Sequence, residues 1–284
     1  MLDLLFSGII YGHVIFLIAL GLTLILGVLR VLNLAHSSLF LLGGYVVWYL
    51  STYFKMNILI ALLIGGLVTG AAGILIERGL RLLYGRAIEY QLLYTYAFVL
   101  ILYDMHRTMF EPLVRAVPVP EAFLGTIKIF EWDLPKVGFL IIPVSAAFAI
   151  FLHLFIEKTR VGINVRAVSF DRETAAFLGI NSKKVFVLII FLETFLSGFG
   201  GGLAGMWIPM SPPSWSPLNV LAFSVLVMGG VGSIKGAYMA SVVIGIIYSI
   251  GTFYFATLST VFPVLIMAIF LLIRPKGLFG REAV

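Results

Sequence analysis

The chain has no cysteine and few charged residues, and each of these two features excludes some kinds of protein or site. Without cysteine there can be no disulfide bond and no thiolate metal site. Only 11% of the 284 residues are charged, against about 25% in an average soluble domain. In contrast, 61% are hydrophobic and the mean hydropathy is +1.12. This composition excludes an ordinary soluble globular fold and indicates a protein that crosses a membrane several times.

Long stretches lack Asp, Glu, Lys and Arg entirely. About 20 apolar residues span the core of a bilayer as a helix, and lipid offers no partner to backbone groups left outside one. We therefore predict an all-α integral membrane bundle that fills residues 1–284 as one domain. The first helix is longer than the h-region of a signal peptide and follows no basic segment, so we expect it to be retained. The predicted helices are 4–29, 36–54, 57–76, 90–106, 138–156, 185–206, 219–230, 237–256 and 259–273.

These nine segments are compatible with two different numbers of membrane crossings. The segment 219–230 is too short to span a core of about 30 Å at 1.5 Å per residue, unless the bilayer is thinned or the helix is broken. The alternatives are nine crossings, or eight crossings and one re-entrant half-helix.

The basic residues predict the orientation, because cytoplasmic loops are enriched in Lys and Arg. Placing three basic clusters, Arg30 and Lys235 inside puts 14 of the 19 basic residues in the cytoplasm. The N-terminus is then outside and the C-terminus inside. The net charge of +6 is therefore an orientation signal, and no soluble basic face interleaved with aromatics suggests nucleic-acid binding. The three clusters are Arg78, Arg81 and Arg86; Lys158 through Lys184; and Arg274, Lys276 and Arg281.

This orientation gives the chain one long loop on each side of the membrane. Residues 107–137 form the external loop, where the alternating stretch Thr126–Asp133 predicts a small β-hairpin. That loop is either a solvated connector or a contact for a soluble external partner. Residues 157–184 form the cytoplasmic loop, an island of charge in an apolar chain.

The cytoplasmic loop has the pattern of a short amphipathic helix at 161–180. Asp171, Arg172 and Glu173 occupy its middle, and Gly179 can end it as the C′ residue. Such a helix can fit a groove on a soluble partner. A plain solvated basic loop would need neither the helical pattern nor the terminating glycine. The apolar positions are Val165, Val168, Ala175, Ala176 and Leu178.

Glycines recur at a spacing of four residues. This spacing lets helix backbones approach closely in lipid, and we interpret all such pairs as tight packing within the chain rather than as evidence of a dimer. The pairs are Gly8/Gly12, Gly66/Gly70, Gly198/Gly202 and Gly201/Gly205.

Two segments place polar or glycine-rich residues at membrane depth, Asn33–Tyr45 and Val227–Tyr238. Interrupted helices in the two halves of a transporter point to a substrate pathway. Glycine-rich interfacial turns are the alternative. The candidate residues for a path or gate in these segments are Asn33, His36, Ser37, Ser38, Gly229, Gly230 and Gly232.

Glu193 is a further candidate for the path, because it lies about 13 Å into a helix at 1.5 Å per residue. An acid at that depth faces the bundle interior or a cavity and is a functional candidate. The alternative is a protonated side chain bonded to a neighbouring helix. His13 and His153 are expected to be satisfied core residues. No His or carboxylate cluster has metal-ligand spacing, and no Ser, His and acid arrangement suggests hydrolysis, so neither a metal site nor an enzyme is expected.

Three stretches resemble the permease subunits of bacterial ABC importers of the branched-chain amino acid type, the LivH-like family. The first comprises Gly21–His36 and Gly43–Tyr45. The second comprises Arg166-Ala167, Asp171–Glu173, Ala175-Ala176 and Leu178–Asn181, which match the family's coupling motif. The third is Phe223–Ala237. The matches cover nearly the whole chain in order. Two departures are Ser37-Ser38, where LivH-like chains more often have Gly-Glu, and Glu193, in a helix usually without an acid.

The resemblance implies a transport subunit of an importer in the bacterial or archaeal inner membrane. It implies a second related permease, two cytoplasmic ATPases that hold ATP and Mg²⁺, and an external solute-binding protein. This chain would bind no cofactor itself, and Arg166, Asp171, Arg172, Glu173, Ala176 and Gly179 would couple it to the ATPases. Branched-chain or related amino acids lead among the small polar solutes that it could carry. A stand-alone channel or secondary transporter for a solute such as urea or an amide is the alternative.

Overall fold

The computed structural model describes residues 2–29, 31–111, 113–129, 131–255, 261–274 and 277–279. Within these ranges helices dominate, joined by one small hairpin and three short 3-10 turns. The helices are α1 (Leu2–Leu29), α2 (His36–Tyr53), α3 (Ile58–Leu80), α4 (Ile88–Phe110), α5 (Gly138–Lys158), α6 (Arg160–Phe170), α7 (Arg172–Phe177), α8 (Ser182–Ala204), α9 (Trp215–Gly229), α10 (Ile234–Tyr254) and α11 (Val261–Ile273). The strands are β1 (Thr126–Ile129) and β2 (Trp132–Pro135), and the 3-10 turns are η1 (Arg81–Leu83), η2 (Glu121–Phe123) and η3 (Pro212–Ser214).

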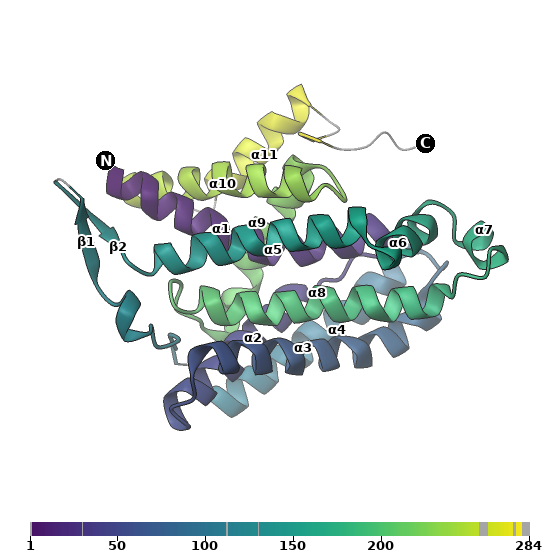
Figure 1. Ribbon diagram of the computed structural model, residues 1–284, viewed down its shortest axis with the longest axis horizontal. Helices are drawn as coiled ribbons and strands as arrows, with labels where there is room; N and C mark the ends of the chain where they lie inside the picture. Colours follow the sequence, from purple (N-terminus) through teal and green to yellow (C-terminus); the bar gives the residue numbers. More distant parts are fainter. Residues whose placement is uncertain are drawn as a thin grey trace.

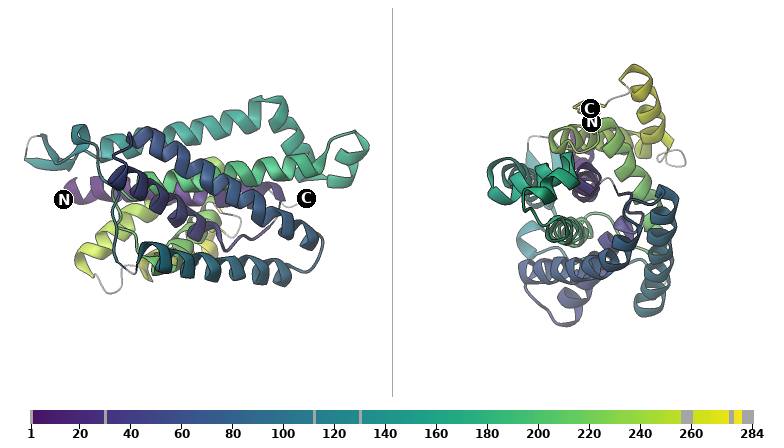
Figure 2. Two further views of the ribbon diagram at one scale, coloured as in Figure 1. Left: turned by 90° about the horizontal axis from the view of Figure 1, so that it is seen from below. Right: turned by 90° about the vertical axis from the view of Figure 1, so that its right-hand side faces the viewer.

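The long helices lie side by side along the longest axis of the molecule (Figure 1, Figure 2). α1 lies at the centre, where it contacts α10, α8, α9 and α5. Five helices of the described chain, α1, α3, α5, α8 and α10, are long and apolar enough to cross a membrane. The polytopic helical bundle is confirmed, and the exact number of crossings stays a prediction.

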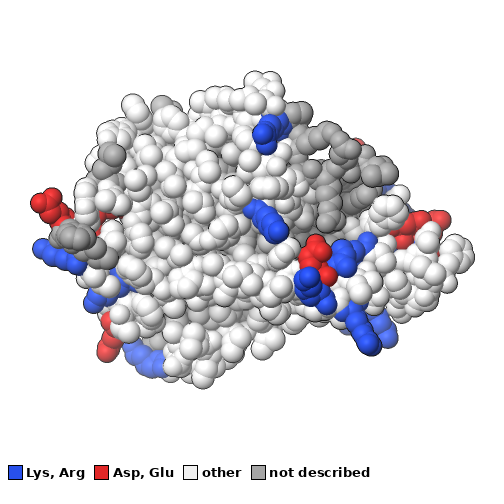
Figure 3. Space-filling view, turned by 45° about the horizontal axis from the view of Figure 1, so that its top comes forward, with Lys and Arg blue, Asp and Glu red and all other residues white. Residues whose placement is uncertain are grey.

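The two ends of the bundle carry different elements. β1 and β2 lie at the end where α1 begins, the hairpin end, and α6 and α7 lie at the opposite end, the α6–α7 end (Figure 1). In the space-filling view most charged side chains gather near these two ends, and the belt between them shows only a few basic side chains on this face (Figure 3). The belt matches the hydrocarbon layer of a bilayer, with the charges toward the water on each side.

The helices begin and end close to the predicted residues, and the hairpin prediction is confirmed. β1 and β2 pair antiparallel, with Thr126 opposite Pro135. α9 starts four residues earlier than predicted, yet its 15 residues span only about 22 Å at 1.5 Å per residue. Some residues of the predicted cytoplasmic basic set and of the predicted helices 237–256 and 259–273 lie outside the described residues, namely Arg30, residues 256–260, Lys276 and Arg281.

The paired glycines pack helix against helix inside the chain, as predicted. A Cβ added at Gly12 would lie 2.8 Å from the Ser241 carbonyl oxygen of α10, and one at Gly66 would lie 2.9 Å from the Phe195 ring of α8. A Cβ at Gly201 would overlap the carbonyl oxygen of Phe40 in α2. Glycine therefore allows α8 to contact both α2 and α3 at backbone distance.

Candidate functional site

The connection between α1 and α2 returns into the interior of the bundle. α1 ends at Leu29 and α2 begins at His36, but the His36 ring reaches the carbonyl oxygen of Ile18, at 2.6 Å from Nε2. Ile18 lies 11 residues before Leu29, or about 16 Å back along the helix at 1.5 Å per residue. The intervening residues 31–35 must therefore fold back to that depth before α2 starts, so the predicted interruption is a discontinuity near the middle of the bundle.

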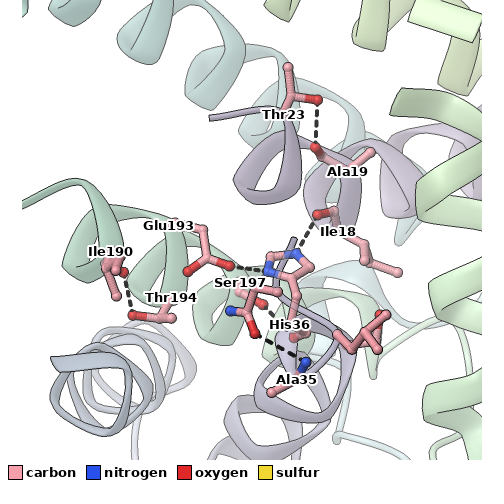
Figure 4. Close-up of polar contacts among 12 residues, drawn as sticks. Ile18, Ala19, Thr23, Ala35, His36, Ile190, Glu193, Thr194 and Ser197 are labelled. Atoms are coloured by element: carbon pink, nitrogen blue, oxygen red, sulfur yellow. Dashed lines mark hydrogen bonds and ion pairs between the residues drawn. The ribbon is translucent and has the colours of Figure 1, made fainter. Parts of the chain in front are cut away.

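His36 and Glu193 form a buried pair at this depth. The side chain of Glu193, which projects from the middle of α8, points at the His36 ring, and its Oε1 is hydrogen-bonded to Nδ1 (Figure 4). Both side chains are fully buried. Because the other ring nitrogen bonds to Ile18, this pair joins α1, α2 and α8.

Gly21 makes room for the pair. A Cβ at this position of α1 would lie 2.6 Å from His36 Cε1 and 3.0 Å from the Glu193 carbonyl oxygen, closer than side chains pack. A glycine on the central helix is therefore required for the two polar side chains to meet where they do.

α9 passes beside the start of α2, and its buried part begins at Leu218. The Ser37 hydroxyl donates to Asn219 Oδ1 at 2.7 Å, and Asn219 Nδ2 donates to the Leu34 carbonyl at 3.0 Å. Asn219 is the fifth residue of α9 and Ser37 the second of α2. The N-terminal end of α2 thus lies inside the bundle, against the second turn of α9. Helix ends inside a bundle also form the substrate sites of transporters built from broken helices.

This arrangement explains how an acid is tolerated at the centre of a membrane protein. The first residue of α2 holds the Glu193 carboxylate, and a helix N-terminus carries a partial positive charge that favours a negative group. We call the buried residues Asn33, His36, Ser37, Ser38 and Glu193 the polar cluster. Two of its buried atoms, Glu193 Oε2 and the Ser38 hydroxyl oxygen, have no hydrogen-bond partner among the described residues. The polar cluster therefore connects the helices and can still form further hydrogen bonds at these two atoms.

The charged island folds as two helices rather than one, which corrects the predicted single helix at 161–180. α6 ends at Phe170 and α7 begins at Arg172, with Asp171 between them in an extended conformation. Asp171 caps α7 by accepting hydrogen bonds from the N–H groups of Glu173 and Thr174. Asp, unlike the helix formers around it, is favoured at an N-cap over a helix interior, and this decides the break.

The burial of the island differs in part from the predicted amphipathic pattern. Val165, Val168 and Ala175 are buried, as predicted, but Ala176 and Leu178 are exposed. The exposed end includes Phe177, 90% accessible. α7 therefore presents an apolar tip to the water, which suits contact with another protein more than a solvated loop.

Gly179 terminates α7 as predicted. Its φ of +81° is the left-handed conformation that favours glycine. The N–H of Ile180 donates to the Ala175 carbonyl and that of Gly179 to the Ala176 carbonyl, both at 3.0 Å. These two bonds are the Schellman pattern and fix the direction in which the chain leaves the helix.

The Asp171 cap depends on pH in a defined direction. The Thr174 hydroxyl, the Thr174 N–H and the Glu173 N–H all stabilise the carboxylate and hold the pKa of Asp171 below its ordinary value. A depressed pKa means that the cap is fully formed above the unfolded value of about 3.9. It is lost as the pH falls through the lower folded value. The Asp171 cap at the start of α7 is therefore fully formed at neutral pH and does not change with small changes in pH.

α6 is attached to the central helix and shares a cavity with the glycine-rich turn before α10. The Ser169 hydroxyl donates to the Gly27 carbonyl of α1 at 2.8 Å. Beside this bond lies a cavity of about 240 Å³ lined by Arg166, Gly232 and Lys235, among others. The structure thus brings together two groups that the sequence placed apart, the Arg166 segment and the turn at 229–232.

The turn itself is built by glycines and closes the end of α9. Gly230 and Gly232 have φ values of +92° and +79°, and Gly229 ends α9. The carbonyl of Gly229 accepts from the N–H of Phe279 at 3.2 Å. This segment lies at the α6–α7 end, so it is not part of the buried polar cluster that holds Asn33, His36, Ser37, Ser38 and Glu193.

Sequence reasoning missed two connecting residues. Asn219 joins α9 to α2, and Ser169 joins α6 to α1. A lone amide in an otherwise apolar helix was the available signal for Asn219, whereas nothing distinguished Ser169 from other serines. Among the described residues no group of three His, Asp or Glu side chains could hold a metal ion.

The chain is similar to known permeases over nearly its whole length. Residues 4–273 match the family model described as the branched-chain amino acid transport system permease component. The chain is 26% identical to the high-affinity branched-chain amino acid transport system permease protein LivH of Escherichia coli, covering 100% of this chain and 96% of that protein. It is 28% identical to the permease protein BraD of Pseudomonas aeruginosa, covering 100% and 97%.

The chain is also similar to a further permease and to a protein of known structure. The probable permease protein LivH of Methanocaldococcus jannaschii is 28% identical, covering 97% of this chain and 91% of that protein. Among solved structures, PsaBC from Streptococcus pneumoniae in complex with Fab has a TM-score of 0.51 at 15% identity, covering 96% of this chain and 89% of that one. The latter supports the fold alone.

Proposed function

The chain belongs to the family of branched-chain amino acid transport system permease components, and from that premise we propose that it is the membrane subunit of an ATP-driven importer. Its substrate is a small polar organic solute, and branched-chain or related amino acids are the leading candidates. The observation that carries the proposal is the match of residues 4–273, which includes both the polar cluster and the α6–α7 segment. This chain forms part of the path and catalyses no reaction.

The substrate class rests on the relatives and on the position of the polar cluster. The similar proteins from Escherichia coli and Pseudomonas aeruginosa are named as branched-chain amino acid permeases. Within this chain, the N-terminal end of α2 lies in the interior, where His36 bonds to Glu193 and Ser37 bonds to Asn219. In transporters, such helix ends face the anionic groups of substrates near the middle of the membrane. We assign Asn33, His36, Ser37, Ser38 and Glu193 to the walls or gate of the path.

Coupling to ATP hydrolysis runs through α6 and α7. The exposed Phe177 and Leu178 and the charged first turn of α7 form the surface for an ATPase subunit, with Arg166, Asp171, Arg172, Glu173, Ala176 and Gly179 building or presenting it. The bond from Ser169 to Gly27 attaches this unit to α1, and Ile18 of α1 bonds to His36. A movement of α6 would therefore be passed to the polar cluster. It drives transport only if the two states of the permease interact differently with the nucleotide-bound ATPases.

The proposal also includes the partner subunits and the orientation of the chain in the membrane. A second related permease completes the path, two ATPase subunits bind ATP and Mg²⁺ at the α6–α7 end, and a solute-binding protein docks at the hairpin end. The α6–α7 end is cytoplasmic, because it holds most of the Lys and Arg residues. The N-terminus is then outside and the C-terminus inside.

A stand-alone channel or secondary transporter is the second candidate. Ion-coupled carriers usually display several intramembrane ionisable groups, and here Glu193 is already bonded to His36. Uptake by cells depleted of ATP at constant membrane potential separates the two: an importer stops, whereas a channel or carrier continues.

Purification from the native membrane tests the assembly directly. We expect a tagged chain, extracted in mild detergent, to retain a second permease and two nucleotide-binding subunits, identified by mass spectrometry. A chain that is recovered alone from several detergents and still moves solute into liposomes would contradict the proposal.

A further inference from the structure

A groove at the α6–α7 end is formed by elements that are far apart in sequence. It has a volume of about 420 Å³ and lies between the end of α1, the turn from η1 to α4, the junction of α6 and α7, and α8. Figures 1 and 2 place the connection from α3 to α4 at the same end as α6 and α7. One wall is aliphatic, from Val28, Leu29, Val31 and Ile88, and the other carries two arginines, Arg86 and Arg172.

The two guanidinium groups are available to bind an anion. Both arginines are exposed, and neither forms an ion pair with an acidic side chain in the described part of the chain. Arg86 is presented by a tight turn in which its N–H donates to the Leu83 carbonyl at 3.1 Å, after Gly85 at φ +81°. The turn fixes the backbone from which the side chain extends into the groove.

Arg172 is held in place by aromatic rings. Its guanidinium carbon lies 4.9 Å from the centre of the Phe186 ring and 5.9 Å from that of Tyr84. Stacking of this kind uses the face of the guanidinium plane. The N–H donors at its edge stay free, in the fork geometry that matches carboxylate or phosphate oxygens.

The groove lies at the ends of helices rather than along their middle. α1, which is long and apolar enough to cross a membrane, ends at Leu29, and α4 begins at Ile88. A ligand here would have an apolar surface on one side and two cations on the other. Basic pockets between membrane helices bind the head groups of anionic lipids for this reason.

We propose that this groove is a binding site for an anionic phospholipid, whose phosphate contacts Arg86 and Arg172 and whose acyl chain begins along Val28, Leu29, Val31 and Ile88. The aliphatic wall favours a lipid over free phosphate, because an ion would leave that wall bare. This site goes beyond the transport function, although it shares Arg172 with the proposed coupling segment. A bound lipid would connect the α3–α4 turn to α7, and so to the coupling segment.

Native mass spectrometry of the full-length chain in detergent tests the site. The probes are phosphatidylglycerol and phosphatidylethanolamine with identical acyl chains, added at equal mole ratios, and inorganic phosphate in a separate sample. We expect phosphatidylglycerol to be retained preferentially and inorganic phosphate to leave its retention unchanged. Equal retention of the two lipids, or displacement of the lipid by inorganic phosphate, would overturn the proposal.

Substitutions locate the binding. Arg86→Gln combined with Arg172→Gln should lower phosphatidylglycerol retention about tenfold, the loss expected for about 1.4 kcal/mol of charge-assisted hydrogen bonding. Arg78→Gln makes the same change at an exposed position of the same end, outside the groove, and should retain lipid like the unmodified chain. Thermal unfolding of each variant reports folding.

Undiminished phosphatidylglycerol retention by the folded double variant would refute the lipid site. If that variant also no longer co-purified with its ATPase partner, the arginines would be assigned to protein docking instead.

Discussion

At the scale of single residues, His36 and Glu193 form a fully buried polar pair that joins α2 to α8. Glu193→Leu would leave His36 Nδ1 buried without its partner, and removing one member of such a pair costs about 3–5 kcal/mol. Glu193→Gln retains an amide that can bond to Nδ1, so its cost should be nearer ~1 kcal/mol. The unfolding temperature in detergent measures both. Equal unfolding temperatures for Glu193→Leu and the unmodified chain would show that the pair does not hold the helices together.

The glycines of α8 make a second prediction at this scale. Gly201→Ala would push a methyl group into the Phe40 carbonyl oxygen, a backbone atom that can move only if α2 and α8 separate. Overpacking of this kind costs about 1–3 kcal/mol.

The neighbouring position provides the matched control. Gly200→Ala would meet Leu17 Cβ at 2.9 Å instead, a much milder overlap than the one at Gly201. We expect the unfolding temperature to fall further for Gly201→Ala than for Gly200→Ala. The reverse order would contradict the close contact between α2 and α8.

At the scale of elements, the unit formed by α6 and α7 is the proposed point of contact with the ATPases. Glu173→Lys reverses a charge in the first turn of α7, where an acid is favoured by the helix dipole. Gly179→Pro is incompatible with the positive φ at that position. We expect both variants to insert into the membrane in normal amounts and to lose ATP-driven uptake, measured with radiolabelled leucine in the reconstituted importer.

A charge reversal elsewhere at the same end controls for this test. Glu89 lies in the first turn of α4 and is exposed, so Glu89→Lys makes the same chemical change outside α6 and α7. Uptake should persist in Glu89→Lys. Uptake at the unmodified rate in both Glu173→Lys and Gly179→Pro would refute the coupling assignment.

At the scale of the whole molecule, the orientation of the bundle can be measured without background, because the chain has no cysteine. Lys128→Cys lies in β1 at the hairpin end, and Lys183→Cys lies in α8 near the α6–α7 end. A membrane-impermeant maleimide should label Lys128→Cys in intact cells and Lys183→Cys only in inverted vesicles. The opposite labelling would reverse the proposed orientation.

The sequence by itself determined the class and the order of the elements. A run of apolar residues has one stable form in lipid, the helix, so its length and its bounding charges predicted the spans, and the alternation at Thr126–Asp133 predicted the hairpin. The glycine spacing likewise predicted close helix contacts, because only a residue without a side chain allows them.

The tertiary structure alone decided which residues meet. Glu193 and His36 were separate candidates, 157 positions apart, and no local property of either helix encodes their contact. The return of residues 31–35 into the bundle and the joining of Asn219 to Ser37 are of the same kind. Each depends on the balance between burying a polar group and finding it a partner, and that partner is supplied by a distant part of the fold.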